Sequence, residues 1–332
     1  MSIKPLYCVI FALFTKIALG EPLIQTTDFP EHDVVVSHED ANGVLQLYRK
    51  SSDGNHSKQL THSKLGCRMP ACAPNGKTLA YAEQTGHGIA LCIADLDGRH
   101  ANTVVADGVN LLPCWASDSI HLIWMKFVGN TEKDPARNSQ LHIINTRNGQ
   151  SRRLFTDPEQ LKFSNAMPPV SPEGKRIAFV SNRDGTMRVW VSDLDGSGAK
   201  PISKPESWHH DVIDAPFEQK VPVWSPDGNW IVHWEGVEMT HMSPFTGVSN
   251  PRRDRMIAET FHVWVVDKDG QQRRRIGKGD DPTWSPDGLV TRAFPDPKYN
   301  GPSIVLEKKS GPLRLPIVPP GKNWGRFTWV PK

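Results

Sequence analysis

The sequence has few of the features that mark nucleic-acid-binding or motif-defined catalytic proteins. Its 39 Lys and Arg nearly balance its 36 Asp and Glu, so the formal net charge is only +3. No helix-turn-helix or zinc-finger spacing is present, and we therefore predict no nucleic-acid partner. The chain also lacks a Gly-x-Ser-x-Gly nucleophile elbow and a compact metal signature of the His-Glu-x-x-His kind. These absences leave no single motif on which to base an enzymatic activity.

Long apolar runs are also absent after the N-terminus. The one apolar stretch, from Leu6 to Leu19, is interrupted by Lys16 and ends in the small-residue sequence Ala18-Leu19-Gly20. This pattern predicts a signal peptide over residues 1–20, with an uncleaved membrane anchor as the alternative. We expect an exported protein, periplasmic or secreted, that has no integral membrane segment after cleavage. Residues 21–332 are predicted to form a single domain, and we expect a monomer.

Cysteine is scarce, with five residues in the chain. Cys8 belongs to the leader, and the other four are Cys67, Cys72, Cys92 and Cys114. In an exported chain these four could form two disulfides, or they could be buried free thiols. Their spacing is poor for zinc.

Turn-forming residues are abundant, and they recur in a repeated phrase. The 28 Pro and 26 Gly show no short period, which is typical of a fold with many tight turns. One phrase recurs at Pro70-Ala-Cys-Ala-Pro-Asn-Gly76, Pro113-Cys-Trp-Ala-Ser-Asp118, Pro169-Val-Ser-Pro-Glu-Gly174, Pro222-Val-Trp-Ser-Pro-Asp-Gly228 and Pro282-Thr-Trp-Ser-Pro-Asp-Gly288, with a truncated copy at Phe327-Thr-Trp-Val-Pro331. The copies lie 43 to 60 residues apart, the range of a four-stranded propeller blade.

Each repeat has the pattern of a four-stranded antiparallel meander. In the clearest one, Arg176–Val180 is apolar on both faces, Asn182-Arg-Asp-Gly185 is a turn, and Arg188–Val191 is the next strand. The chain begins within a unit, and the copy at 327–331 supplies its missing strand. The predicted fold is all-β: a six-bladed propeller of four-stranded antiparallel blades, closed by pairing of the N- and C-terminal strands.

These repeats resemble the WD-repeat-like propeller repeats of the TolB family. The resemblance rests on the phrase above and on segments such as Cys92-Ile-Ala-Asp-Leu-Asp-Gly98, and it covers nearly all of the chain after the leader. It implies a periplasmic scaffold that binds envelope proteins, although little chain separates the leader from the first strand for the additional N-terminal domain of TolB. More distantly, the repeats are similar to those of oligogalacturonate lyases, which implies a divalent metal and a saccharide ligand.

The irregular segments are predicted to share one face of the propeller. The Ser-Pro-Asp-Gly and Asp-Leu-Asp-Gly turns occupy one face, because connections alternate between faces in a meander. The insertions at 126–139, 157–167, 204–220 and 235–260 then belong to the opposite face, here called the long-loop face. Long loops on a rigid scaffold commonly carry function, so we place the site there.

Two insertions, 204–220 and 235–260, supply the candidate site residues. The predicted ligand-binding residues are Trp208, Asp211, Glu235, Glu238, Arg252, Arg253 and Arg255. The candidates for catalysis are His209, His210 and His241, and those for metal ligation are His209, His241 and His262. Imidazoles with carboxylates suit a divalent ion such as Mn, Zn or Ca, whereas arginines suit an anionic sugar.

These residues leave two functions open. The first is binding of a ligand or an envelope protein on the long-loop face, and the alternative is a metal-dependent uronate lyase or hydrolase on the same face. The same residue types also occur in any polar surface loop. Two further predictions concern packing: equivalent Trp residues such as Trp190 and Trp264 pack between blades, and Arg273-Arg-Arg275 forms a solvated edge.

Overall fold

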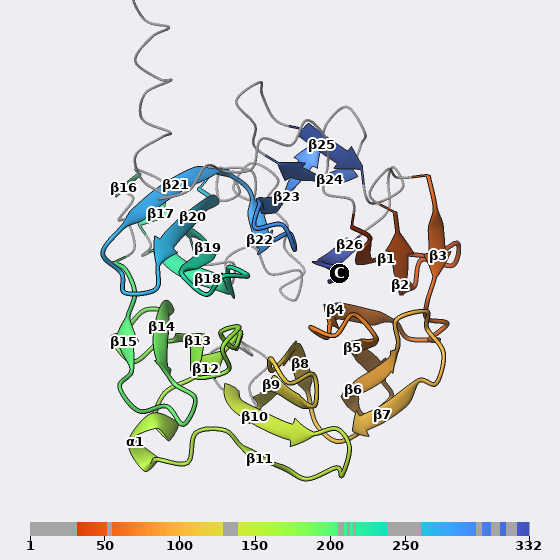
Figure 1. Ribbon diagram of the computed structural model, residues 1–332, viewed down its shortest axis with the longest axis horizontal. Helices are drawn as coiled ribbons and strands as arrows, with labels where there is room; N and C mark the ends of the chain where they lie inside the picture. The colour runs from red at the N-terminus through yellow and green to blue at the C-terminus, as the bar shows by residue number, and fades with distance from the viewer. Residues whose placement is uncertain are drawn as a thin grey trace, which may run out of the picture.

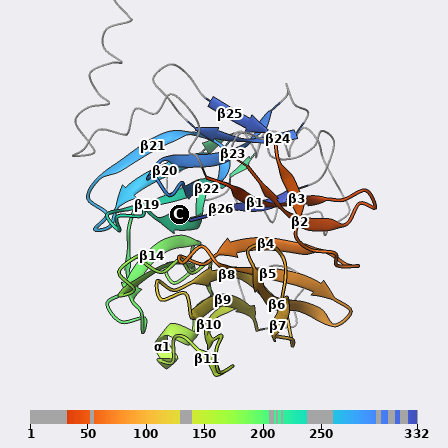
Figure 2. The ribbon, with the colours of Figure 1, turned by 45° about the vertical axis from the view of Figure 1, so that its right-hand side comes forward.

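The computed structural model shows an all-β propeller whose sheets surround a central axis (Figure 1). It describes residues 32–51, 55–128, 139–204, 209–210, 213–214, 217–237, 260–296, 301–306, 313–316 and 324–331. Six antiparallel sheets have four strands each, and a seventh has two. Figure 2 shows the same ring turned, with α1 (Pro158–Leu161) lying beside β11 at its periphery in both views.

The strands follow one another outward from the axis in each sheet. The first sheet contains β26 (Trp324–Trp329), β1 (Val34–Glu39), β2 (Leu45–Lys50) and β3 (Ser57–Gln59). The second contains β4 (Cys67–Cys72), β5 (Thr78–Thr85), β6 (Gly88–Asp95) and β7 (Asn102–Val105). The third contains β8 (Asn110–Trp115), β9 (His121–Phe127), β10 (Ser139–Asn145) and β11 (Ser151–Arg153).

The remaining sheets follow in the same order along the chain. The fourth contains β12 (Asn165–Ala166), β13 (Arg176–Ser181), β14 (Arg188–Asp193) and β15 (Lys200–Pro201). The two-stranded sheet pairs β16 (His209–His210) with β17 (Ile213–Asp214). The next contains β18 (Phe217–Trp224), β19 (Trp230–Val237), β20 (His262–Asp267) and β21 (Arg273–Lys278). The last contains β22 (Asp280–Trp284), β23 (Val290–Asp296), β24 (Gly301–Leu306) and β25 (Leu313–Pro316).

The two ends of the chain meet in the first sheet, as the repeat pattern predicts. Strand β26 pairs antiparallel with β1, with Val34 opposite Trp329 and Val36 opposite Phe327. The backbone N–H of Val330 also donates to Asp33 O at 2.9 Å. The last strand of the chain therefore supplies the inner strand of the first sheet.

The predicted number of six blades needs a correction. Apolar clusters of described residues join successive sheets from the first round to β22–β25. At the last junction, the contacts described between β22–β25 and the first sheet are polar: Trp329 Nε1 donates to Thr291 Oγ1 at 2.9 Å, and Arg326 Nε lies 2.6 Å from Asp281 Oδ1.

The six-bladed prediction is therefore wrong as stated. Five sheets form regular blades, and the β16–β17 sheet stands outside the ring (Figure 1). The β22–β25 sheet differs from the five because its described contacts with the first sheet are polar. One physical reason lies in the β23–β24 pairing, where Pro295 stands opposite Pro302. Proline has no backbone N–H to donate, which weakens the ladder of that sheet.

The repeated phrase forms the turn between the first two strands of a blade. In one copy, Gly228 N donates to Ser225 O at 2.9 Å, and Ser225 Oγ accepts from Trp230 N at 2.9 Å. The Ser171 and Ser285 hydroxyls accept equivalent bonds from Arg176 N and Leu289 N. The serine thus ties the turn to the returning strand, while the glycine adopts the positive φ that the turn requires.

A second kind of turn presses a glycine against the neighbouring blade. Gly270 has φ +77°, and a Cβ on it would lie 2.3 Å from Ile202 O. Gly288 has the same φ of +77° but has nothing within 4 Å of its Cβ position. A comparison of the two glycines therefore distinguishes the cost of a positive φ from the cost of a steric clash.

Substituting these two glycines should cost different amounts of stability. We expect Gly288→Ala to lose about 1 kcal/mol, because alanine tolerates positive φ poorly. Gly270→Ala should lose about 1–3 kcal/mol more, because the new methyl group overlaps a backbone oxygen. Urea denaturation of both variants measures this, and equal losses would contradict the steric argument.

The inner strands carry an unusual bulge just before a proline. Met69, Leu112, Met167, Val221 and Asp281 all have φ between 41° and 56°. Each precedes a proline, and a residue in that position is kept out of the right-handed helical region. The bulge shifts the register between the first two strands, as between Lys220 and Val223. The packing prediction is confirmed for Trp190, which is buried in a cluster shared by the third and fourth sheets. Trp264 is also buried, and its ring is covered by Arg273 of the same sheet.

The four cysteines of the second and third sheets are free thiols, so the disulfide alternative is not what the structure shows. Burial raises the pKa of Cys67 and of Cys72 to about 12, and that of Cys92 to about 11. At neutral pH the reactive thiolate is therefore almost absent.

Thiol titration should reflect this burial. We expect Cys67, Cys72, Cys92 and Cys114 to react with Ellman's reagent much more slowly in the native protein than in guanidinium. The measurement is the absorbance of released thionitrobenzoate over time. Rapid stoichiometric reaction of the native protein would contradict the burial of these groups.

Candidate functional site

The two longest insertions leave from the same end of one hairpin. Strands β18 and β19 pair on both sides of their bulge, ending with Phe217 opposite Val237. The segment 205–216 enters the hairpin at Phe217, and the segment 238–259 leaves it at Val237. The two insertions therefore begin side by side at the Phe217–Val237 end of the hairpin.

An apolar cluster makes this base rigid. Phe217, Trp234, Val237 and Phe261 are all buried, and the rings of Trp234 and Phe261 have centroids 4.8 Å apart. Gly236 sits so close to Phe261 that a Cβ would lie 2.5 Å from its ring. Both insertions are thus anchored on tightly packed residues.

Glu235 lies at the centre of a buried polar network beside this cluster. Its side chain is 1% exposed, and its Oε2 accepts from Arg273 Nη2 at 2.6 Å and from Gln219 Nε2 at 3.1 Å. Gln219 also bonds the preceding blade, because its Oε1 accepts from Val189 N and its Nε2 donates to Ser203 Oγ. The network therefore joins two blades beneath the long-loop face.

The contacts of Arg273 correct the prediction that Arg273–Arg275 forms a solvated edge. The run Arg273–Arg275 is not simply a solvated edge, because Arg273 is paired with Glu235 and its guanidinium stacks 3.6 Å from the centroid of the Trp264 ring. Sequence reasoning missed Arg273 and Gln219.

His262 is the candidate metal ligand whose side chain is described. It is half-buried at the start of β20, directly opposite Glu235. Its Nδ1 lies 2.9 Å from Thr260 O, a geometry in which Nδ1 donates and Nε2 keeps its lone pair. A histidine held in this way is suited to bind a metal through Nε2.

The other predicted site residues are placed incompletely or not at all. His209 and His210 are described by their backbone in β16, where His209 stands opposite Asp214. The remaining predicted residues lie outside the described part of the chain: Trp208, Asp211, Glu238, His241, Arg252, Arg253 and Arg255. Their roles, and that of Glu235 in ligand binding, stay predictions.

A metal centre is likewise untested by the described residues. Within them, no group of three or more His, Cys, Asp or Glu side chains is arranged to hold an ion. Glu235 and His262 are brought opposite each other, but the carboxylate is already bound by Arg273. A metal site on this face with three or more His, Cys, Asp or Glu ligands would need at least one ligand from outside the described part of the chain.

The fold and this site define a propeller with an elaborated long-loop face, and comparison with known proteins identifies its family. Residues 33–243 match the TolB beta propeller domain. The chain belongs to this family.

Relatives and solved structures agree with this assignment. A protein TolB homolog of Chlorobium luteolum is 29% identical over 157 residues, which are 47% of this chain and 33% of the relative. The chain thus spans about a third of the length of that relative.

Among solved structures, TolB from Acinetobacter baumannii has a TM-score of 0.66 at 16% identity, covering 91% of this chain and 67% of the other. An oligogalacturonate lyase in complex with manganese has a TM-score of 0.53 at 16% identity, covering 85% and 73%. At these identities the likeness concerns the fold. In the described residues, no helix has the length and apolarity needed to cross a membrane.

Proposed function

We propose that this protein is an exported binding scaffold that holds an envelope protein or a ligand on its long-loop face. The observation that carries the proposal is the shared origin of the two longest insertions at the Phe217–Val237 end of one rigid hairpin. Such an arrangement lets two long segments start from one fixed base, and binding residues are commonly carried by loops on a rigid scaffold.

Membership of the TolB propeller family supports binding over catalysis. The buried network supports it as well, because Glu235 is engaged by Gln219 and Arg273 and stabilises the base of the insertions. The proposal includes removal of residues 1–20 and a periplasmic or secreted location. The proposal includes no nucleic-acid partner.

Site-specific photo-crosslinking tests which face binds. A photoreactive amino acid at position 238, where the longest insertion begins, is compared with one at Asp195, an exposed residue of a short turn on the opposite face. In envelope fractions of the source organism, we expect discrete protein adducts from position 238 only. Equal adducts from both positions, or none from 238 and none with envelope saccharides, would sink the proposal.

A metal-dependent uronate lyase or hydrolase remains the second candidate, favoured by the orientation of His262. Its test is metal analysis of the purified protein together with absorbance of unsaturated products from uronate polymers. A stoichiometric divalent ion that is lost in His262→Ala or His241→Ala would favour the enzyme. No ion and no product absorbance would leave binding as the function.

A further inference from the structure

A small pocket lies on the opposite face from the proposed binding site, at the turn end of the third blade. It has a volume of about 220 Å³ and is lined by His121, Ile143, Asn145, Gln150, Ser151 and Arg152. These residues come from β9, β10, β11 and the β10–β11 turn. No acidic side chain is among them.

The cation in this pocket is held in place and has no acidic partner among the described residues. Arg152 Nη1 donates to Arg153 O at 3.0 Å and to Leu154 O at 3.3 Å. The described part of the chain contains no ion pair of Arg152, and its side chain is exposed. A guanidinium anchored on two carbonyls is oriented before it meets a ligand, and its remaining N–H groups can bind an oxyanion.

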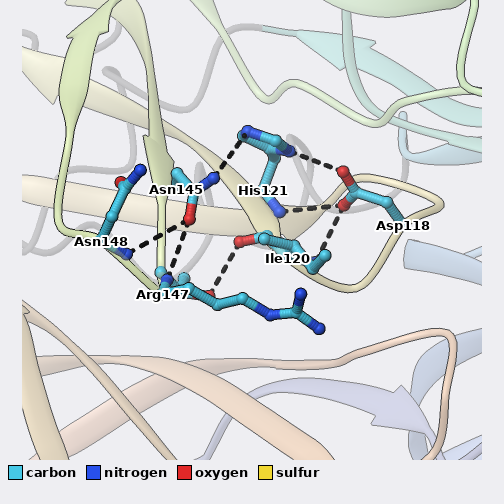
Figure 3. Close-up of polar contacts among 7 residues, drawn as sticks. Asp118, Ile120, His121, Asn145, Arg147 and Asn148 are labelled. Atoms are coloured by element: carbon cyan, nitrogen blue, oxygen red, sulfur yellow. Dashed lines mark hydrogen bonds and ion pairs between the residues drawn. The ribbon is translucent and has the colours of Figure 1, made fainter.

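The opposite wall is fixed by a hydrogen-bonded chain (Figure 3). Asp118 Oδ2 lies 2.6 Å from His121 Nδ1, and Asp118 Oδ1 accepts from the backbone N–H groups of Ile120 and His121. Asn145 Nδ2 lies 3.4 Å from His121 Nε2. The carboxylate of Asp118 is thus bound to the backbone N–H groups of its own turn and to the His121 ring.

The composition of the hairpin adds to the positive character of the pocket. The β10–β11 hairpin, residues 139–153, contains three arginines and no Asp or Glu. Ser151 and Gln150 add neutral donors beside the guanidinium, and Asn148 Nδ2 lies 3.4 Å from Gln150 Oε1, which leaves Gln150 Nε2 to donate. The side chain of Ile143 supplies an apolar wall.

We propose that this pocket binds the oxyanion of a small molecule, a carboxylate or a phosphate group, through Arg152, Ser151 and Gln150. The volume of about 220 Å³ admits such a group with a short organic portion. This site is independent of the proposed function, because it lies on the face built from short turns.

Titration with two probes tests the site. Inorganic phosphate and acetate are titrated separately into the full-length protein at low ionic strength, and the imidazole signals of His121 are followed by NMR. We expect saturable shifts at millimolar concentration with at least one probe, and the probe that binds identifies the class of anion. The absence of saturation with both probes would overturn the proposal.

Matched variants separate specific binding from general charge. Arg152→Gln should weaken binding about tenfold, because a charge-assisted hydrogen bond is lost. Arg147→Gln removes the same charge from the same hairpin but from a residue that does not line the pocket, and it should leave binding unchanged. Equal weakening by both variants would show nonspecific attraction and refute the site. Thermal unfolding checks that both variants remain folded.

Discussion

Replacing Glu235 with alanine is expected to lower the free energy of unfolding by about 3–5 kcal/mol. The carboxylate is 1% exposed, and its removal leaves Arg273 without its charge partner in a partly buried position. Gln219 Nε2 would also lose one of its two acceptors. The measurement is urea-induced unfolding at neutral pH.

The ion pair of Glu159 and Lys162 provides a matched control. Their side chains are 70% and 59% exposed, so Glu159→Ala should cost at most about 1 kcal/mol. A double variant, Glu235→Leu with Arg273→Met, should recover much of the loss, because apolar side chains can replace a buried pair. A loss at Glu235 no greater than at Glu159 would contradict the buried network.

Acidification is expected to destabilise the protein through His233. Its imidazole is fully buried on β19, and its Nε2 has no hydrogen-bond partner among the described residues. Burial, reinforced by the nearby Arg273, lowers the pKa of His233 to about 3 from the usual 6.5. Nδ1 lies 3.4 Å from Trp234 O, which offsets this only in part.

The sign of the effect follows from proton linkage. The folded protein keeps His233 neutral, whereas the unfolded chain binds a proton below about pH 6.5. The contribution of neutral His233 to the free energy of unfolding is therefore fully present above about pH 6.5. It is lost as the pH falls toward 3, by about 1.4 kcal/mol for each pH unit.

A neutral substitution of His233 isolates this contribution. The stability of His233→Leu and of the wild type should be compared by urea unfolding between pH 8 and pH 4. We expect the difference to shift in favour of the variant as the pH falls, because leucine binds no proton. Stability curves that stay parallel over this range would show that His233 does not titrate in this way.

Much of the fold could be predicted from the repeated phrase alone. The phrase predicts a turn because serine, proline, aspartate and glycine each favour turn geometry locally, and Ser225 and Gly228 make the expected bonds. The truncated copy near the C-terminus predicts the pairing of β26 with β1, because it supplies the strand that the first unit lacks. Equivalence of the blades could not be predicted, because the packing between sheets depends on side chains far apart in the sequence.

The candidate site was only partly predictable. The position of the insertions follows from strand order, and this brings Phe217 and Val237 together. The pairing of Glu235 with Arg273 joins residues 38 positions apart, and a polar run beside a turn gives no local sign of it. The pocket at Arg152 could not be predicted either, because His121 of β9 and Arg152 of β11 come together only in the folded blade.

The sequence by itself determined the strands, their turns and the family of this protein, because these depend on local backbone preference and on repetition. Only the tertiary structure decided which polar side chains are buried, paired or exposed. Burial depends on the neighbouring blade. Arg273 is therefore partly buried in an ion pair with Glu235, whereas Arg152 is an exposed cation that has no ion pair within the described residues.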